Sequence, residues 1–347
     1  MEKPGLNILM IAPLSAGLVH GGVRMQSLKT AEHLEKLSHR VTCYNPWENY
    51  ALEDFDIVHL FLAGNETLTT ARRLGESGSK LVVSPVFFTR RSPAAIRSTL
   101  KMEEIGKQMV KGIFSDYSIK ASVCKSADLV LPNTTAEAVL IRDGFGIPEE
   151  QISVVPNGVD LHFAEAGPDL FLSKHGVKNF TLFVGDAAAR RKNVLALLQE
   201  HTPDDNPLVI IGKFDQSGYS RQCLDIVNSR ENIRSLGPLD HDDPMLASAY
   251  AAADVFVLPS QFETPGIAAL EAGLAGCKIA ITEVGGTREY FGDEAQYINP
   301  ESKGSIINAI RAAHDKPETS GLKNHIINNY SWEMVAKQTI NAYQKIS

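Results

Sequence analysis

The sequence has few cysteines and no long apolar run. Its four cysteines, Cys43, Cys124, Cys223 and Cys277, are scattered along the chain and form no C-x-x-C pair. This spacing argues against a zinc site or a disulfide framework and favours a reducing compartment. No stretch approaches the roughly 20 apolar residues that a membrane-spanning helix requires. We therefore expect a cytoplasmic protein that does not cross a membrane.

A surplus of positive charge and a dinucleotide-binding loop are also missing. The formal net charge at pH 7 is −7, whereas nucleic-acid binding generally relies on surplus Lys and Arg that contact phosphates. No G-x-G-x-x-G motif follows a predicted strand with an acidic residue about 20 positions later. These absences argue against a nucleic-acid-binding protein and against a dinucleotide-dependent dehydrogenase.

The segment from Leu6 to Val19 is apolar enough to be compared with a secretory signal peptide. Asn7, Pro13 and Ser15 interrupt it, however, and no A-x-A cleavage site follows. We interpret the segment as a buried first strand that leads into a loop.

Short apolar runs alternate with helical patterns along the chain. The first run, residues 7–13, precedes a helical pattern over residues 23–37. The further strand candidates are all short and apolar, and they cover residues 39–45, 56–61, 80–88, 127–133, 180–186, 207–213, 232–238, 254–260 and 278–284. Strands that alternate with helices predict an α/β protein with doubly wound parallel sheets.

The length and one turn near the middle of the chain indicate two domains. A chain of 347 residues suits two domains of about 170 residues each. A Pro and an Asn-Gly pair at positions 156–158 form a turn signal. We predict an N-terminal Rossmann-like domain at residues 1–155, a second one at 156–330, and a final helix at 331–347.

The segment DVFVLPSQFETPGIAALEAGLAGCKIAI, residues 254–281, is the most informative part of the sequence. A strand ends before a loop that contains Glu263, and the residues from Thr264 to Gly266 open a helix that contains Glu271. The carboxyl end of a strand followed by a helix N-terminus is where parallel α/β sheets bind ligands. Free N–H groups and the positive end of the helix dipole favour phosphate there.

Two carboxylates flank this predicted phosphate site. Glu271 lies about one and a half turns inside the helix, so it and Glu263 can reach different parts of one ligand over about 8–12 Å. Carboxylates repel phosphate but accept hydrogen bonds from sugar hydroxyls, which suits a nucleotide sugar. Alternatively, Glu263 is a partner of the helix dipole and Glu271 is a solvated helix residue.

The stretch FETPGIAALEAGLAGCKIAITEVGGTREYF resembles the E-x7-E signature of glycosyltransferase family 4, whose members have the GT-B fold and retain the anomeric configuration. ISVVPNGVDLHF is similar to the family's interdomain hinge, and YSWEMVAKQTINAYQKI to its closing helix, which crosses back to the N-terminal domain. The resemblance implies two Rossmann-like domains that face each other across a cleft. The acceptor would bind the N-terminal domain, and the nucleotide-sugar donor the C-terminal domain.

The resemblance also assigns roles to individual residues. Glu263 would contact hydroxyls of the transferred sugar, and Glu271 would bind the ribose hydroxyls. Lys192 matches the family's phosphate-binding lysine, and its charge would stabilise the departing diphosphate.

Further donor contacts would come from backbone and loops. Pro265, Gly266 and Ile267 would present their backbone to the diphosphate. Gly21 and Gly22 would let the N-terminal domain approach the donor, unless they form a plain turn. The segment from Gly237 to Leu239 would lie near the nucleobase.

Two positions depart from the family pattern. Asp186 occupies the place of an arginine, and an acidic side chain beside a diphosphate would repel it. Either Asp186 points elsewhere and Arg190 or Arg191 replaces that arginine, or the donor is handled differently. Val86 occupies the place of a histidine that many members carry.

The paired histidines of the family are reduced to one. His59 is a candidate contact for the acceptor, while Phe61 occupies the second position. A single His at a strand end is also compatible with a structural role.

Two acidic runs could be interpreted as metal-binding sites. The DHDD run at residues 240–243 contains a D-x-D pair, but Pro244 follows and a helix begins. A helix N-cap by one of its last two aspartates explains the run more simply. Asp204 and Asp205 lie in a polar loop, where we expect them to be solvated. We predict no metal and no cofactor, with the nucleotide sugar as substrate.

Residues 90–125 are basic and amphipathic. Eight Lys or Arg residues face three Asp or Glu residues in this segment. Leu100, Ile105, Met109, Val110 and Ile113 are interleaved with them. The segment can form a helix that lies on anionic lipid at the inner face of the membrane, line an acceptor groove, or be an ordinary surface helix.

The sequence therefore predicts a retaining, metal-independent glycosyltransferase. Its acceptor is a glycan, a lipid-linked molecule or a small molecule. Asp186 and Val86 leave open a degenerate member that binds the nucleotide sugar without turnover. A nucleotide-sugar epimerase of the same fold is a further alternative, but we see no additional set of cleft carboxylates and histidines of the kind such enzymes use.

Overall fold

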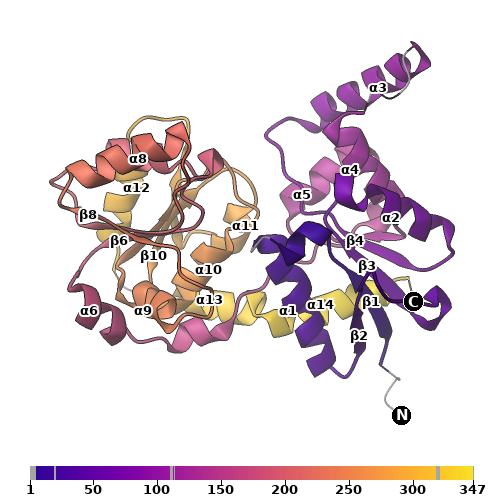
Figure 1. Ribbon diagram of the computed structural model, residues 1–347, viewed down its shortest axis with the longest axis horizontal. Coiled ribbons are helices and arrows are strands. Elements are labelled where there is room, and N and C mark those ends of the chain that lie inside the picture. The colour runs from indigo at the N-terminus through magenta and orange to yellow at the C-terminus, as the bar shows by residue number, and fades with distance from the viewer. Residues whose placement is uncertain (1–4, 19–20, 110–111, 113, 318–320, 347) are drawn as a thin grey trace. The chain divides into compact units, whose positions relative to one another are not determined.

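The computed structural model describes residues 5–18, 21–109, 112, 114–317 and 321–346, with the backbone alone at 108 and 109. The chain divides into two compact units, which are drawn in Figure 1. Unit 1 comprises Met1–Gly158 and Trp332–Ser347, and unit 2 comprises Val159–Ser331. The boundaries lie within three residues of the sequence-based ones, and the final helix belongs to unit 1.

Unit 1 is built on a parallel sheet with the strand order β2-β1-β3-β4-β5. Its strands are β1 Asn7–Ile11, β2 Arg40–Cys43, β3 Ile57–Phe61, β4 Leu81–Ser84 and β5 Leu129–Val130. Its α-helices are α1 Gly22–Lys36, α2 Asn65–Glu76, α3 Pro93–Met109, α4 Asp116–Lys125, α5 Thr135–Val139 and α14 Trp332–Tyr343.

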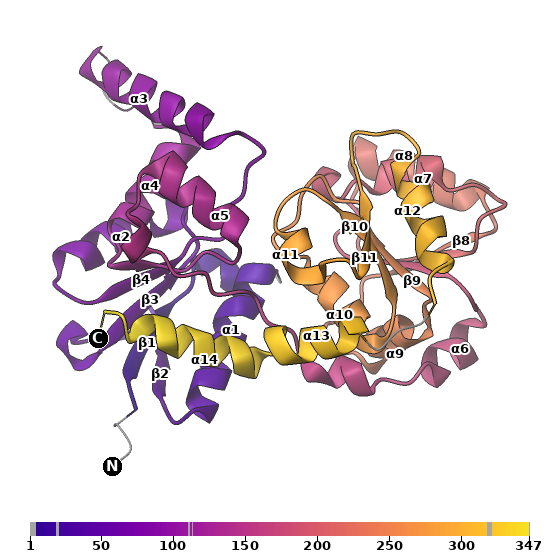
Figure 2. The same cartoon turned by 180° about the vertical axis from the view of Figure 1, so that it is seen from behind.

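Both faces of the unit 1 sheet are covered by helices, which explains why its central strands are mostly apolar on both faces. Ile8 and Met10 of β1 pack with α1 and α14, while Leu9 and Ile11 pack with α2 and α4 on the other face. Figure 2 shows α14, in yellow, alongside α1. This arrangement confirms a doubly wound sheet.

Unit 2 is built on a second parallel sheet, with the order β11-β10-β9-β6-β7-β8. Its strands are β6 Thr181–Val184, β7 Leu208–Ile211, β8 Ile233–Gly237, β9 Val255–Leu258, β10 Lys278–Thr282 and β11 Ala295–Ile298. Its α-helices are α6 Asp169–His175, α7 Val194–Glu200, α8 Gly218–Ser229, α9 Pro244–Ala252, α10 Ile267–Ala275, α11 Thr287–Phe291, α12 Ser305–His314 and α13 Gly321–Tyr330.

The winding of the unit 2 sheet reverses at its centre. The chain runs outward from β6 through β7 to β8, and then returns to β9 on the opposite side of β6. In open parallel sheets, ligands bind beyond the carboxyl ends of the strands where the winding reverses. The topology therefore directs attention to the loops that follow β6 and β9.

The DHDD run ends in a helix cap. The side chain of Asp243 accepts a hydrogen bond from the backbone N–H of Met245, and Pro244 occupies the first position of α9. The predicted capping role is thus confirmed, because the carboxylate satisfies an N–H group that has no partner within the helix.

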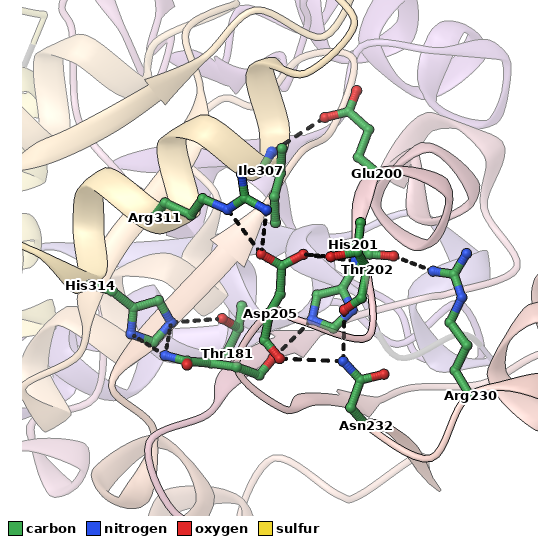
Figure 3. Close-up of polar contacts among 11 residues, drawn as sticks. Thr181, Glu200, His201, Thr202, Asp205, Arg230, Asn232, Ile307, Arg311 and His314 are labelled. Atoms are coloured by element: carbon green, nitrogen blue, oxygen red, sulfur yellow. Dashed lines mark hydrogen bonds and ion pairs between the residues drawn. The ribbon is translucent and has the colours of Figure 1, made fainter.

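The loop before β7 corrects one prediction. Asp205 is not solvated: its side chain is buried, and it accepts hydrogen bonds from Arg311 of α12 at 2.7 Å and from the backbone and hydroxyl of Thr202. Figure 3 shows Asp205 between these two partners. Burial alone would raise the pKa of Asp205, but the bonds from Thr202 and Arg311 lower it. The network ties α12 to the amino edge of the sheet.

Residues 90–125 form two helices, α3 and α4, rather than one. Ser115 caps α4 by accepting a hydrogen bond from the N–H of Ser118. In both ribbon views α3 projects from the rest of unit 1. Val110 and Ile113 lie outside the described residues, as does the side chain of Met109. Among the helices described, none is both long and apolar enough to cross a membrane.

Candidate donor site

The loops that follow β6 and β9 are tied together at the reversal point of unit 2. Asn193 adopts a left-handed backbone conformation with φ of 58°, and its side-chain amide donates to the carbonyl of Pro259 at 3.2 Å. The N–H of Gln261 donates to the carbonyl of Arg191 at 2.8 Å. These bonds hold residues 190–192 against the segment that contains Glu263.

Glu263 lies at the centre of this assembly. Its Oε1 atom is 2.7 Å from Nζ of Lys192 and 3.2 Å from a guanidinium nitrogen of Arg191, and it accepts a hydrogen bond from Ser260 at 2.6 Å. Burial would raise the pKa of Glu263, but the charges of Lys192 and Arg191 and the hydrogen bonds lower it below its ordinary value. The carboxylate is therefore ionised and paired with two cations.

The backbone of Glu263 is fixed as firmly as its side chain. Its N–H donates to Val284 at 3.0 Å, and its carbonyl accepts from Gly286 at 2.9 Å. A Cβ atom at Gly285, where φ is 110°, would lie 1.9 Å from the carbonyl oxygen of Glu263. Gly285 is thus a positioning residue that the sequence analysis missed. The paired glycines after β10 were the available signal.

The N-terminus of α10 follows directly. Gly266 has φ of 84°, and a Cβ atom there would lie 3.0 Å from the side chain of Leu258. The positive φ favours a glycine at this position, and a larger residue would also crowd Leu258. Pro265 is buried, and Ile267 begins the helix. A nine-residue helix that starts beside two cations offers backbone N–H groups and a positive dipole end to an anion.

Glu271 is buried rather than solvated, with 5% of its surface exposed. Its Oε1 atom lies 3.0 Å from Nε2 of His241, and its Oε2 accepts a hydrogen bond from the hydroxyl of Tyr250 at 2.8 Å. Neither His241 nor Tyr250 was singled out from the sequence, because the DHDD run drew attention to its aspartates alone. The alternative in which Glu271 is a solvated helix residue is wrong.

The departure at Asp186 has a local explanation. The carboxylate of Asp186 is exposed and accepts a hydrogen bond from the N–H of Ala188 in its own loop. Arg191 reaches Glu263 and donates to the carbonyl of Phe262 at 2.9 Å. Arg190 instead lies over the ring of Tyr219. Of the two candidate replacements, Arg191 is the one that joins Lys192.

Comparison with known families fits this geometry. A family model described as "Glycosyl transferases group 1" matches residues 178–316, and a model described as "Glycosyltransferase Family 4" matches residues 47–163. The first match covers β6 to α12, including Lys192, Glu263 and Glu271.

The chain belongs to glycosyltransferase family 4.

Relatives of this family 4 chain are distant in sequence. The MMP alpha-(1->4)-mannosyltransferase of Mycolicibacterium hassiacum is 24% identical over 84% of the chain and 71% of the relative. The D-inositol 3-phosphate glycosyltransferase of Pseudarthrobacter chlorophenolicus is 28% identical over 64% of the chain and 56% of the relative. An uncharacterised glycosyltransferase of Methanocaldococcus jannaschii is 29% identical over 58% of the chain. The chain spans just over half the length of the last two, 56% and 55%.

Solved structures share the GT-B fold of the family 4 chain. Sucrose-phosphate synthase from Thermosynechococcus elongatus superposes with a TM-score of 0.75 at 16% identity, covering 98% of this chain and 99% of the other. The Anabaena protein HepE in complex with UDP superposes with a TM-score of 0.70, also at 16% identity, covering 98% and 100%. At this level of identity, the likeness establishes the fold.

Other predicted donor contacts of the family 4 chain stay predictions. A Cβ atom at Gly21 or Gly22 would meet nothing within 4 Å, so the folded chain itself leaves room for larger residues there. Leu239 is half-buried and lies two residues before His241. Val86, in the place of the family histidine, has φ of 51°, a strained conformation for a β-branched residue.

His59 is not an acceptor contact, because it lies in the core of unit 1 with 1% of its surface exposed. Nδ1 is 2.7 Å from the hydroxyl of Tyr343, and Nε2 is 2.9 Å from the hydroxyl of Ser84. Burial lowers the pKa of His59 to about 3. Both ring nitrogens are occupied, so the residue links α14 to the sheet and has a structural role.

Proposed function

We propose that this chain transfers a sugar from a nucleoside-diphosphate sugar to an acceptor hydroxyl, with retention of anomeric configuration. The observation that supports the proposal is the pairing of Lys192 and Arg191 with Glu263 where the unit 2 sheet reverses its winding. Cations and a helix N-terminus suit the diphosphate, and a carboxylate suits sugar hydroxyls.

The reaction breaks the bond between the anomeric carbon and the diphosphate oxygen. The acceptor oxygen forms the new bond on the same face, and its proton passes to the departing phosphate. The products are a glycoside and a nucleoside diphosphate. The charge on the leaving group grows as the bond breaks, so Lys192 and Arg191 stabilise the transition state more than the ground state.

Each carboxylate has a separate task in this proposal. Glu263 accepts hydrogen bonds from the sugar, while Lys192 exchanges part of its contact with Glu263 for contact with phosphate. Glu271 accepts hydrogen bonds from the ribose. The backbone of residues 265–267 contacts the diphosphate.

We further propose that transfer proceeds without a metal ion. Two side-chain cations and the α10 N-terminus supply positive charge at the proposed phosphate position. Asp243 of the DHDD run is already engaged as the cap of α9.

Nucleotide binding is the decisive experiment. We expect one of UDP, GDP or ADP, or its sugar conjugate, to raise the melting temperature by mass action. UDP is the first choice, because the similar HepE structure contains it. Glu271→Ala should reduce the stabilisation, because the ribose contact is lost, while Glu231→Ala, which removes an exposed carboxylate in the same unit, should leave it intact. If no nucleotide stabilises the protein, the proposal is wrong.

Turnover separates an enzyme from a degenerate binder. Donor hydrolysis or transfer to an added acceptor should release the nucleoside diphosphate in the wild type, and Glu263→Ala should abolish that release. Binding of a nucleotide sugar without release under any acceptor would favour the degenerate binder.

On the acceptor side, we propose that α3 contacts an anionic membrane. Met102 and Ile105 are 73% and 55% exposed, and Lys101 lies beside them on an exposed surface. The buried Glu103 is paired with Lys107 at 2.6 Å, so its negative charge is neutralised. Glu104 is also exposed in this stretch, but Arg97 and Lys101 of the same helix outnumber it. An exposed apolar strip with a small basic surplus suits a lipid surface and a lipid-linked acceptor.

Vesicle sedimentation tests this contact. The protein should bind phosphatidylglycerol vesicles and not phosphatidylcholine vesicles, and Lys101→Glu should weaken binding by at least about fivefold. Lys174→Glu makes the same charge change on the exposed surface of unit 2 and should have no effect. Equal behaviour of the two variants, or no binding to phosphatidylglycerol, would remove the membrane contact from the proposal.

A further inference from the structure

The carboxylate of Glu271 is held from two sides by residues outside its own helix. His241, from the loop after β8, approaches Oε1 at 3.0 Å, and Tyr250 of α9 donates to Oε2 at 2.8 Å. A carboxylate offers about four lone-pair positions. Two are used here, so the carboxylate can still accept hydrogen bonds from two hydroxyl groups.

His241 is the partner whose charge can change. Its Nε2 faces Glu271, and its Nδ1 lies 3.1 Å from the carboxylate of Asp242. Both neighbours are hydrogen-bond acceptors, so both ring nitrogens must donate, and the imidazolium is the form that does so. The geometry alone therefore favours a charged His241.

Aromatic side chains fix the orientation of the His241 ring. The ring of Phe163 meets it edge to face at a centroid distance of 5.4 Å, and that of His162 at 5.9 Å. Phe163 also packs against Tyr250, at 5.5 Å. Phe163 therefore packs against both residues that donate hydrogen bonds to Glu271. The side chain of His241 is 25% exposed, whereas Tyr250 is fully buried.

We propose that His241, as the imidazolium, is a positioning residue that aims the Glu271 carboxylate at the ribose hydroxyls of the donor nucleotide. This inference rests on the proposed function. It makes His241 a determinant of the preference for ribonucleotides over 2′-deoxyribonucleotides, through Glu271 and without contact between His241 and the sugar.

The charged groups around His241 support this role. Glu271 of α10 faces Nε2, Asp242 faces Nδ1, and Asp160 adds a third negative charge. The hydrogen bond to Glu271 is the largest influence and, against partial burial, raises the pKa of His241 to about 9. Tyr250 and His162 complete the titratable surroundings. Near neutral pH both ring N–H groups are therefore present, and above about pH 9 one is lost.

The test compares matched nucleotides on matched variants. Titration calorimetry would measure the Kd of UDP and dUDP, or of the GDP or ADP pair if that nucleotide stabilises the wild type. We expect the wild type to prefer the ribonucleotide by about tenfold, the magnitude of a hydrogen bond to a charged group. Glu271→Ala should abolish this preference, which verifies that the pair of ligands reports on the carboxylate.

Two substitutions of His241 then test whether its hydrogen bonds and charge, rather than its aromatic packing, determine the preference for the ribonucleotide. His241→Phe keeps the aromatic packing and removes both ring nitrogens, so the ribonucleotide Kd should rise about tenfold while the deoxyribonucleotide Kd changes little. His241→Gln keeps one donor without charge, and should retain part of the preference with no change between about pH 7 and pH 10. In the wild type the preference should fall over this range.

Turnover gives a second readout. A positioning role predicts a higher donor KM at nearly constant kcat, because the ribose contact is the same in ground and transition states. Asp205→Ala, at the opposite edge of the unit 2 sheet, controls for lost stability.

The outcomes distinguish this inference from the proposed function. If no nucleotide binds to the wild type, both the role of His241 and the proposed function are wrong. If nucleotides bind but the His241 variants keep the wild-type preference, or lose affinity for both sugars equally, His241 does not position Glu271 and the proposed function stands. If His241→Phe does not fold, His241→Gln decides on the same criteria.

Discussion

Nζ of Lys192 lies 2.7 Å from Oε1 of Glu263, so the proposed phosphate cation and the proposed sugar carboxylate are bound to each other. Arg191 shares the same oxygen atom at 3.2 Å. A diphosphate that enters must therefore compete with a carboxylate for the lysine. Two cations for one carboxylate leave net positive charge at the site, which favours the entry of the anion.

Replacing Lys192 should impair transfer without unfolding the protein. Lys192→Met keeps the aliphatic chain and removes the charge that stabilises the leaving group. We expect kcat to fall by about 10²–10³-fold, the magnitude of a lost transition-state contact. Steady-state kinetics of nucleoside diphosphate release would measure it. Lys174→Met, an exposed lysine in the same unit, should have wild-type activity, and similar losses in both variants would contradict the assignment.

Glu263 should be essential for transfer. Glu263→Ala removes the proposed sugar contact and leaves Lys192 and Arg191 facing each other without their shared carboxylate. We expect no measurable transfer, with a circular dichroism spectrum like that of the wild type. Nucleoside diphosphates should still bind, because the cations remain. Wild-type turnover in this variant would disprove the assigned role.

Chelation should leave the reaction unaffected. If Lys192 and Arg191 supply the charge that stabilises the diphosphate, EDTA should not change the initial rate. A rate that collapses with EDTA and recovers on addition of Mn²⁺ would revive the DHDD run at residues 240–243 as a metal site.

Stability should depend on pH through His241. Its pKa is raised from 6.5 to about 9 in the folded protein. The resulting stabilisation is fully present below pH 6.5 and is lost as the pH rises through 9. After allowance for partial exposure, the free energy of unfolding of the wild type should exceed that of His241→Phe by about 1–2 kcal/mol more near pH 6 than near pH 10. Urea denaturation at the two pH values measures this, and a constant difference would refute it.

The buried Asp205 should matter for stability and not for the donor site. Asp205→Ala removes the partner of Arg311 and Thr202, which should lower the free energy of unfolding by about 1–3 kcal/mol. Its loop precedes β7, at the edge of the sheet opposite Glu263. Nucleotide affinity at a temperature where the variant is folded should therefore be unchanged. Weaker binding would show that the two edges are coupled.

Features encoded by neighbouring residues were predictable from the sequence. The apolar strands follow from their composition, and the cap at Asp243 from the Pro that follows it. The loops of Lys192 and Glu263 both follow strands, so the rules of parallel sheets bring them to one edge. β11 was not predicted, because its sequence AQYI is short and only its first and last residues are buried.

Partners that are distant in the sequence were not predictable. Asp205 is buried by Arg311, which lies 106 positions later, and His59 by Tyr343, which lies 284 positions later. No local pattern distinguishes such residues from solvated or catalytic ones. His241 illustrates the same limit. Its partner Glu271 lies 30 positions later, in the helix after β9, and β6 and β7 separate β9 from β8 in the sheet.

The division of unit 1 between the two ends of the chain has a consequence for synthesis on the ribosome. Trp332 and Tyr343 complete the core beside β1 and β3, and Tyr343 supplies the hydroxyl bonded to His59. Unit 2 is continuous and is finished first, whereas the first 158 residues must wait for the last sixteen. We therefore expect the usual order of vectorial folding to be inverted, with the C-terminal unit maturing before the N-terminal one.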